Sequence, residues 1–218
     1  MRLNRSFLSA ILVFLLAAPL TVSFCGQEVR DGWVPVVAKK AQRFYKLSSG
    51  GTTLLSEELG IFLRNSDGST YTRAIPVGGT ATTWNAEATL EDARDGKTYA
   101  IDYQHRRATV IQRPEPGTVL PLNPPTGEDY QARSPDLSLG SKIIGGVECV
   151  GWKVVERGPH NPGGEIWVAP SLSYLIVESK IVDKGHDAFI DMVLEDIHGG
   201  KEPDPQFFHI PEGFKVVE

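Results

Sequence analysis

The chain has 218 residues, of which 41% are hydrophobic and 22% are charged, and this composition excludes a disordered chain. Its formal net charge of −5 at pH 7 would repel nucleic acid and anionic membrane surfaces, so we expect neither as a partner. The 22 glycines and 15 prolines indicate many turns rather than long helices.

Residues 1–26 have the pattern of an export signal peptide. Arg2 and Arg5 precede an apolar run over residues 7–22, and Pro19 interrupts this run before it could comfortably span a bilayer. We therefore expect an exported mature chain, periplasmic or secreted, with no membrane span once the signal is removed.

The two cysteines do not indicate a disulfide framework. Cys149 lies in an apolar segment, where we interpret it as a small buried hydrophobe. Cys25 lies at the cleavage region, so it is either removed with the signal or left in the mature chain, where it could pair with Cys149 or carry a lipid. The bulky Phe24 disfavours lipid anchoring at Cys25, because lipoprotein signals place a small residue there.

Alternating apolar and polar residues predict an antiparallel meander in the first half of the chain. Residues 38–47 suit either a short helix or the first strand. Turn residues at 65–68 and at Asp95-Gly96 predict hairpins. The clearest alternation places Trp84, Ala86, Ala88 and Leu90 on one apolar face of a strand. The strands predicted after residue 47 are 53–64, 69–75, 83–93, 98–103 and 108–112.

A proline-rich segment over residues 114–135 separates the two halves. Proline removes backbone donors and fixes φ, so this segment cannot be a central strand or a helix. It is either a linker between two small domains or a surface crossover within one. We favour the crossover, because each half alone would have few strands with which to close a core. The prediction is therefore one domain over residues 27–218.

The second half repeats the meander. Gly163-Gly164 and Gly199-Gly200 are interpreted as turns, whereas Gly145-Gly146 is interpreted as a bulge or bend within one strand. The tail over residues 203–208 predicts a tight turn that buries an aromatic side chain. The predicted strands are 142–156, 165–168 continuing into 172–182, 187–197 and 213–217. The fold class that follows is mainly β, with little helix: a large curved antiparallel sheet or open half-barrel built from two meanders.

The sequence offers no catalytic motif. It has no Gly-x-Ser-x-Gly elbow, no phosphate-binding loop and no zinc spacing among its five histidines. His160 and His198 fall in loops at the same end of the predicted sheet, so a metal-dependent hydrolase is the least favoured hypothesis. We expect a non-enzymatic protein with no cofactor and no metal.

Four aromatic residues are the candidate ligand-binding set: Trp84, Trp152, Trp167 and Phe189. They either line the concave face of the sheet or fill the core. The leading hypothesis is an envelope protein that binds an apolar or amphiphilic, lipid-like ligand on that face. The alternative is a scaffolding protein that holds an unknown protein partner through strand edges or the proline-rich segment.

The second half carries a recognisable series of motifs: Ile144-Gly145-Gly146-Val147, Trp167-Val168-Ala169-Pro170-Ser171-Leu172, Pro203-Asp204-Pro205 and Ile210-Pro211-Glu212-Gly213-Phe214. They resemble a family of exported bacterial proteins of unknown function, common in acidobacteria. The resemblance covers most of the mature chain and implies no catalytic residue. More distantly, the chain is similar to the outer-membrane lipoprotein carrier and receptor fold, which implies a curved sheet around an apolar cavity. Those carriers close the cavity with several helices, whereas this sequence has at most one short candidate.

Overall fold

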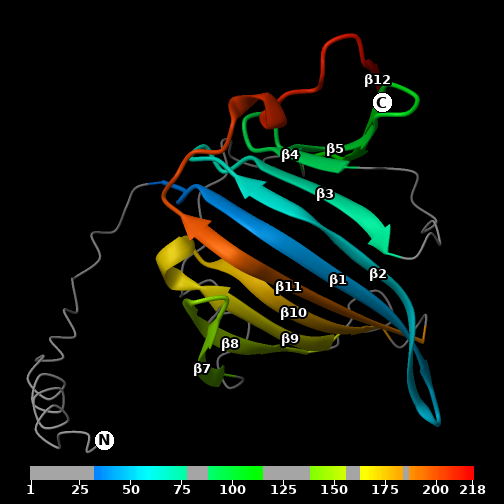
Figure 1. Ribbon diagram of the computed structural model, residues 1–218, viewed down its shortest axis with the longest axis vertical. Helices are drawn as coiled ribbons and strands as arrows, with labels where there is room; N and C mark the ends of the chain where they lie inside the picture. Colours follow the sequence, from blue (N-terminus) through cyan, green and yellow to red (C-terminus); the bar gives the residue numbers. More distant parts are fainter. Residues whose placement is uncertain (1–31, 78–87, 115–137, 156–162, 184–186) are drawn as a thin grey trace, which may run out of the picture.

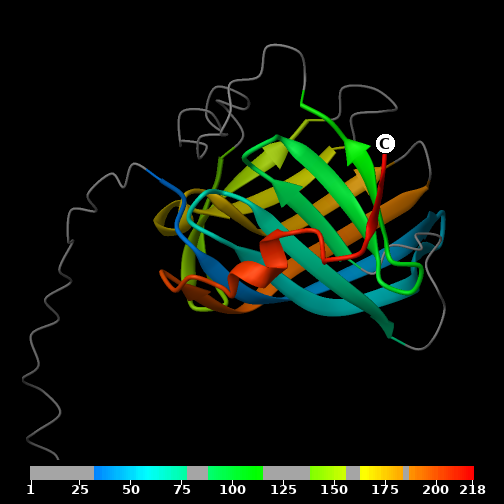
Figure 2. The same ribbon diagram turned by 90° about the horizontal axis from the view of Figure 1, so that it is seen from above.

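The computed structural model describes residues 32–77, 88–114, 138–155, 163–183 and 187–218. Within these residues, twelve strands form one sheet in the order β12-β6-β5-β4-β3-β2-β1-β11-β10-β9-β8-β7. The sheet is open and strongly curved (Figures 1 and 2), so its two halves face each other across an interior. The predicted class, mainly β with a curved sheet made of two meanders, is confirmed. The predicted signal at residues 1–26 and the crossover at 114–135 lie essentially outside the described residues.

Neighbouring strands along the chain pair antiparallel throughout the first meander. Residues 38–47, for which the sequence left helix and strand open, belong to the first strand. Residues 83–87 lie outside the described residues, so only the second part of the strand predicted over 83–93 is seen. The six strands are β1 (Val36–Ser48), β2 (Gly51–Arg64), β3 (Thr70–Val77), β4 (Ala88–Asp92), β5 (Lys97–Asp102) and β6 (Arg107–Gln112).

The second meander joins the first where β11 pairs antiparallel with β1. The last strand of the chain, β12, pairs parallel with β6, so the sheet is mixed at that edge. Two short 3₁₀ turns, η1 (Pro170–Leu172) and η3 (Pro205–Phe208), are the helical elements of the described residues. The remaining strands are β7 (Ser138–Ile144), β8 (Val147–Val154), β9 (Gly163–Ala169), β10 (Leu175–Asp183), β11 (Ala188–Gly199) and β12 (Lys215–Val217).

Two glycine pairs behave differently from the sequence interpretation. Gly145 and Gly146 have φ values of 56° and 83° and form the two-residue turn between β7 and β8, so the predicted single strand over 142–156 is a hairpin. Positive φ at both central positions is the geometry that such hairpins favour. Gly163 and Gly164 are the first two residues of β9 rather than a turn, and β10 approaches the backbone of Gly164 closely.

The chain also reverses where the sequence predicted a continuous path from 165–168 into 172–182. After β9, η1 leads to Ser173 and Tyr174, which have positive φ values of 51° and 53°. This left-handed pair returns the chain antiparallel along β9 as β10. Pro170 at the first position of η1 and the two left-handed residues together make the reversal.

The two faces of the sheet have different roles. We call the face that carries Lys40, Phe62, Thr72 and Leu194 the inner face, since these side chains line the pocket described below, and the opposite face the outer face. On the outer face of β2–β5, Leu63, Tyr71, Leu90, Tyr99 and Ile101 form a buried cluster that the C-terminal segment covers with Phe208. Phe208 is the aromatic side chain that the predicted tail turn was expected to bury.

A second buried cluster lies where the two meanders meet. It joins Val36 and Ala38 of β1 and Leu194 of β11 to residues of β8, β9 and β10, including Cys149, Trp167 and Val177. Cys149 is buried with a free thiol, as the sequence interpretation expected, and burial raises its pKa to about 11. Leu175 and Leu194 of this cluster also line the pocket described below.

Charges of alternating sign lie on facing residues of six neighbouring strands. The register aligns Lys153, Glu165, Lys180, Asp191, Arg43 and Glu57 in one row. Arg43 Nε lies 2.7 Å from Glu57 Oε1, and Arg43 Nη1 lies 3.9 Å from Asp191 Oδ2. Opposite charges on facing residues favour this register over a one-residue slip, which would break every pair.

Candidate functional site

A cavity of about 510 Å³ opens on the inner face. Its lining comes from β1–β6 on one side and from β10 and β11 on the other, with Trp33 and Tyr174 at one end. The volume lies within the range of roughly 300–1,000 Å³ typical of small-molecule sites. The curvature of the sheet makes the cavity, because it brings Gln112 of β6 and Ile176 of β10 to the same space.

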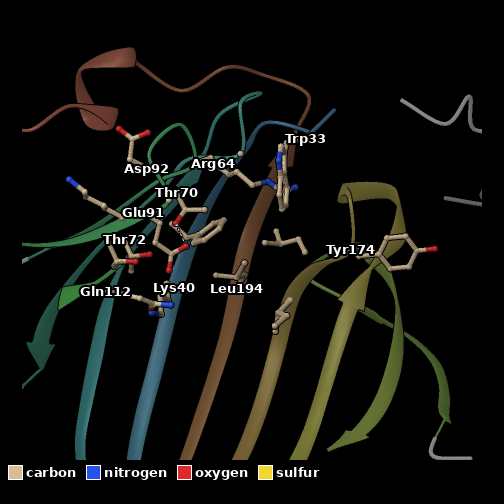
Figure 3. Close-up of a pocket in the computed structure, with 18 of the residues that line it drawn as sticks. Trp33, Lys40, Arg64, Thr70, Thr72, Glu91, Asp92, Gln112, Tyr174 and Leu194 are labelled. Atoms are coloured by element: carbon tan, nitrogen blue, oxygen red, sulfur yellow. Dashed lines mark hydrogen bonds between the residues drawn. The ribbon is translucent and has the colours of Figure 1, made fainter. Parts of the chain in front are cut away.

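One wall of the pocket is polar. Thr70 and Thr72 of β3 and Glu91 of β4 point into it, as does Gln112 of β6, and Figure 3 shows these side chains together. Their placement follows from the register, in which Thr70 pairs with Glu91. Thr70 Oγ1 donates a hydrogen bond of 2.8 Å to Glu91 Oε2. Polar positions of β3, β4 and β6 therefore face the cavity, while the apolar positions Tyr71 and Leu90 of β3 and β4 face the C-terminal segment.

The other wall is apolar. Leu175 and Ile176 of β10 and Met192 and Leu194 of β11 form it, and Phe62 of β2 lies between the two walls. The two-residue period predicted for residues 187–197 places Met192 and Leu194 on the same face. The pocket thus combines an apolar side with a hydrogen-bonding side, an arrangement that suits an amphiphilic molecule.

Arg64 fixes the end of the pocket near Trp33. It is 2% exposed, and its guanidinium donates hydrogen bonds to two backbone carbonyls, those of Val34 at 2.9 and 3.1 Å and of Leu172 at 2.6 Å. The guanidinium carbon also lies 5.1 Å from the centroid of the Trp33 ring. Arg64 therefore ties β2, the segment before β1 and η1 together. The strand alternation had correctly placed it on the face opposite Leu63.

Lys40 of β1 is a basic residue that lines the pocket. It is half-buried, and it follows Val36 and Ala38 along the inner positions of β1. Burial lowers the pKa of the Lys40 ammonium, although Glu58 and Glu91 act in the opposite direction. Among the described residues, no hydrogen bond or ion pair holds its Nζ. A lysine among inward-facing apolar positions was the sequence signal that could have identified this residue.

The aromatic residues predicted to bind a ligand are not gathered in this pocket. Trp167 is 8% exposed and belongs to the buried cluster at the meeting of the meanders, and Trp152 is half-buried on β8. Phe189 stacks on Tyr45 at 5.4 Å between ring centroids, on the face of β11 opposite Met192. Trp84 lies outside the described residues. A ligand-binding role for these four residues remains a prediction.

The described residues contain no cluster of three or more side chains that could hold a metal ion. His198 is exposed near the end of β11, and His160 lies outside the described residues. The same part of the chain contains no helix long and apolar enough to cross a membrane.

No protein-family model matches the chain, and no curated protein matches its sequence. Among solved structures, the chain is similar to an uncharacterised conserved protein from Thermus thermophilus, with 10% identity, a TM-score of 0.43, and coverage of 82% of this chain and 89% of that one. The MucA/MucB complex of Pseudomonas aeruginosa matches with 15% identity and a TM-score of 0.40, over 83% of this chain and 58% of that one.

A putative outer membrane lipoprotein-sorting protein domain from Vibrio parahaemolyticus also matches, with 10% identity, a TM-score of 0.35, and coverage of 81% of this chain and 90% of that one. The name of this domain is that of the protein class to which the sequence has a distant resemblance. With identities of 10–15% and TM-scores of 0.35–0.43, these likenesses carry no argument about the role of this chain.

Proposed function

We propose that this protein is an exported, non-enzymatic protein of the cell envelope that binds an amphiphilic, lipid-like molecule in the pocket of the inner face. The two-sided lining of the pocket carries the proposal. Apolar side chains of β10 and β11 offer a surface for a hydrocarbon chain, and hydroxyl, amide and charged groups of β3–β6 offer partners for a head group. Cleavage of residues 1–26 and residence in the periplasm or outside the cell belong to the same proposal.

Burial of a hydrocarbon chain supplies the driving force. Each methylene removed from water contributes about 0.8 kcal/mol, so a chain that covers Ile176, Met192 and Leu194 gains several kcal/mol. The open side of the pocket leaves the head group near solvent, where Glu91 and Gln112 are exposed.

A displacement assay tests the proposal. The mature protein is loaded with a fluorescent alkyl dye, and unlabelled dodecyl maltoside is added below its micelle-forming concentration. We expect saturable displacement with one site per chain. Thr72→Trp, which fills the pocket from β3, should weaken dye binding at least about tenfold. Ile75→Trp is the matched control, because Ile75 lies on the outer face of the same strand and is 62% exposed. Equal dye affinity in both variants would contradict the proposal.

The second candidate function is a scaffold that binds a protein partner. The observation in its favour is β7, the last strand of the sheet, whose Ile143 is 77% exposed. Such an edge can accept a further strand from a partner. Native mass spectrometry of the protein purified from its own envelope separates the two candidates, since a bound small amphiphile supports the first and a bound polypeptide without amphiphile supports the second.

A further inference from the structure

We infer that the amphiphile carries an anionic head group and that Lys40 binds this group. The inference rests on the proposed function and adds to it the chemical class of the ligand. It follows from the position of the Lys40 ammonium, from the charges around it and from the apolar wall within its reach.

Without a ligand, the partly buried position of the charged Lys40 ammonium is energetically unfavourable. Its side chain extends from the middle of β1 into the cavity, and burial disfavours the charged ammonium there. A buried charge ordinarily has a hydrogen-bonded partner, yet in the described part of the chain Nζ has neither an ion pair nor a hydrogen bond. All three ammonium donors are therefore available to a bound molecule.

The nearby carboxylates do not take the place of that partner. Glu58 and Glu91 act on Lys40 from beyond the 4.0 Å of an ion pair, and Glu91 already accepts the hydrogen bond from Thr70. Asp92 is paired with Arg94 at 2.6 Å. The charged residues that line the pocket are three basic and two acidic, which gives a net charge of +1 on a chain of net charge −5: Lys40, Arg64, Lys97, Glu91 and Asp92.

The apolar wall determines the orientation of the bound amphiphile. Lys40 pairs in register with Leu194, so the ammonium rises from the sheet beside the residues that would contact a hydrocarbon chain. Figure 3 shows Lys40 between the polar side chains of β3–β6 and Leu194. An anion held by Lys40 with its chain directed toward Met192 and Ile176 satisfies both walls at once. A carboxylate or a phosphate monoester supplies the required anionic oxygens.

Competition among dodecyl compounds with different head groups tests the inference. Dodecanoate and dodecyl phosphate should displace the dye at concentrations at least about tenfold lower than dodecyl maltoside or dodecyltrimethylammonium, as expected for a charge-assisted hydrogen bond. Comparison of the two anions distinguishes a carboxylate ligand from a phosphate ligand. Lys40→Met should abolish the preference for anions, and Lys40→Arg should retain it.

Lys39→Met is the matched control, because Lys39 precedes Lys40 but lies on the outer face, paired with Asp196 at 2.6 Å. It should keep the full preference for anions. Lys40→Met should melt no lower than the parent chain, so its lost preference cannot come from unfolding. Equal affinity for all head groups, unchanged in Lys40→Met, would overturn the inference and leave the proposed function intact. Failure of every dodecyl compound to displace the dye would instead overturn the proposed function.

Discussion

Replacement of Arg64 by methionine should destabilise the protein strongly. The change removes three hydrogen bonds to two carbonyl acceptors, those of Val34 and Leu172. A buried acceptor left without its donor costs about 1–3 kcal/mol, so two acceptors give about 2–6 kcal/mol. Loss of the buried guanidinium relieves part of this cost, and we expect a net loss of about 2–4 kcal/mol.

The assay is urea unfolding followed by tryptophan fluorescence, with the free energy of unfolding extrapolated to water. Arg113→Met is the control, because Arg113 contacts Glu218 at 3.3 Å with 52% of its side chain exposed, and such pairs contribute at most about 1 kcal/mol. A value for Arg64→Met within about 0.5 kcal/mol of the parent would refute the reasoning that Arg64 holds this end of the pocket together.

Three further predictions concern the packing of the sheet and its pH dependence. Phe208→Ala should lower the free energy of unfolding by about 3–5 kcal/mol in the same urea assay, because Phe208 is 2% exposed in the outer-face cluster. A loss below about 1 kcal/mol would contradict that packing. Gly60→Ala should lower the free energy of unfolding by about 1–3 kcal/mol, because the added Cβ would overlap the Arg73 carbonyl on β3. Gly50→Ala is the control, since its Cβ would meet open space and should change thermal stability little. Equal melting temperatures of the two variants would argue against the β2–β3 contact. Burial raises the pKa of Glu178, but hydrogen bonds from Lys142 and Lys180 outweigh it and leave the pKa below its usual value. The stabilising contribution of Glu178 is therefore complete above the pKa that its carboxyl has in the unfolded chain, and it is lost as pH falls through the folded pKa. The difference in the free energy of unfolding between the parent and Glu178→Gln should close in acid. A difference independent of pH would contradict this assignment.

Alternation along the strands could be predicted from the sequence, but the role of each face could not. The period of residues 53–64 separates Leu59, Ile61 and Leu63 from Gly60 and Arg64, as in the structure. A sequence pattern does not show that the C-terminal segment covers the apolar side. In the structure the polar side faces the pocket, so its lining residues Lys40 and Thr72 were not among the aromatic candidates.

The glycine pairs show a second limit of the sequence. A pair of glycines suits a turn, a bulge or a close approach of two backbones equally well, and only tertiary pairing decides among them. Gly145-Gly146 forms a turn because β7 and β8 pair with each other. Gly163-Gly164 continues a strand because β10 packs directly against it. The number of strands in the second meander was therefore harder to predict than its β character.

The most direct test of amphiphile binding in the inner-face pocket uses the methyl group of Met192. The chain has two methionines, Met1 and Met192, and Met192 lines the apolar wall. With methyl-¹³C-methionine labelling, the signal of Met192 is assigned as the one that Met192→Leu removes. We predict a saturable shift of this signal on addition of dodecanoate, with weaker binding in Lys40→Met. A signal that stays unchanged while the dye is displaced would place the bound molecule elsewhere and contradict the account.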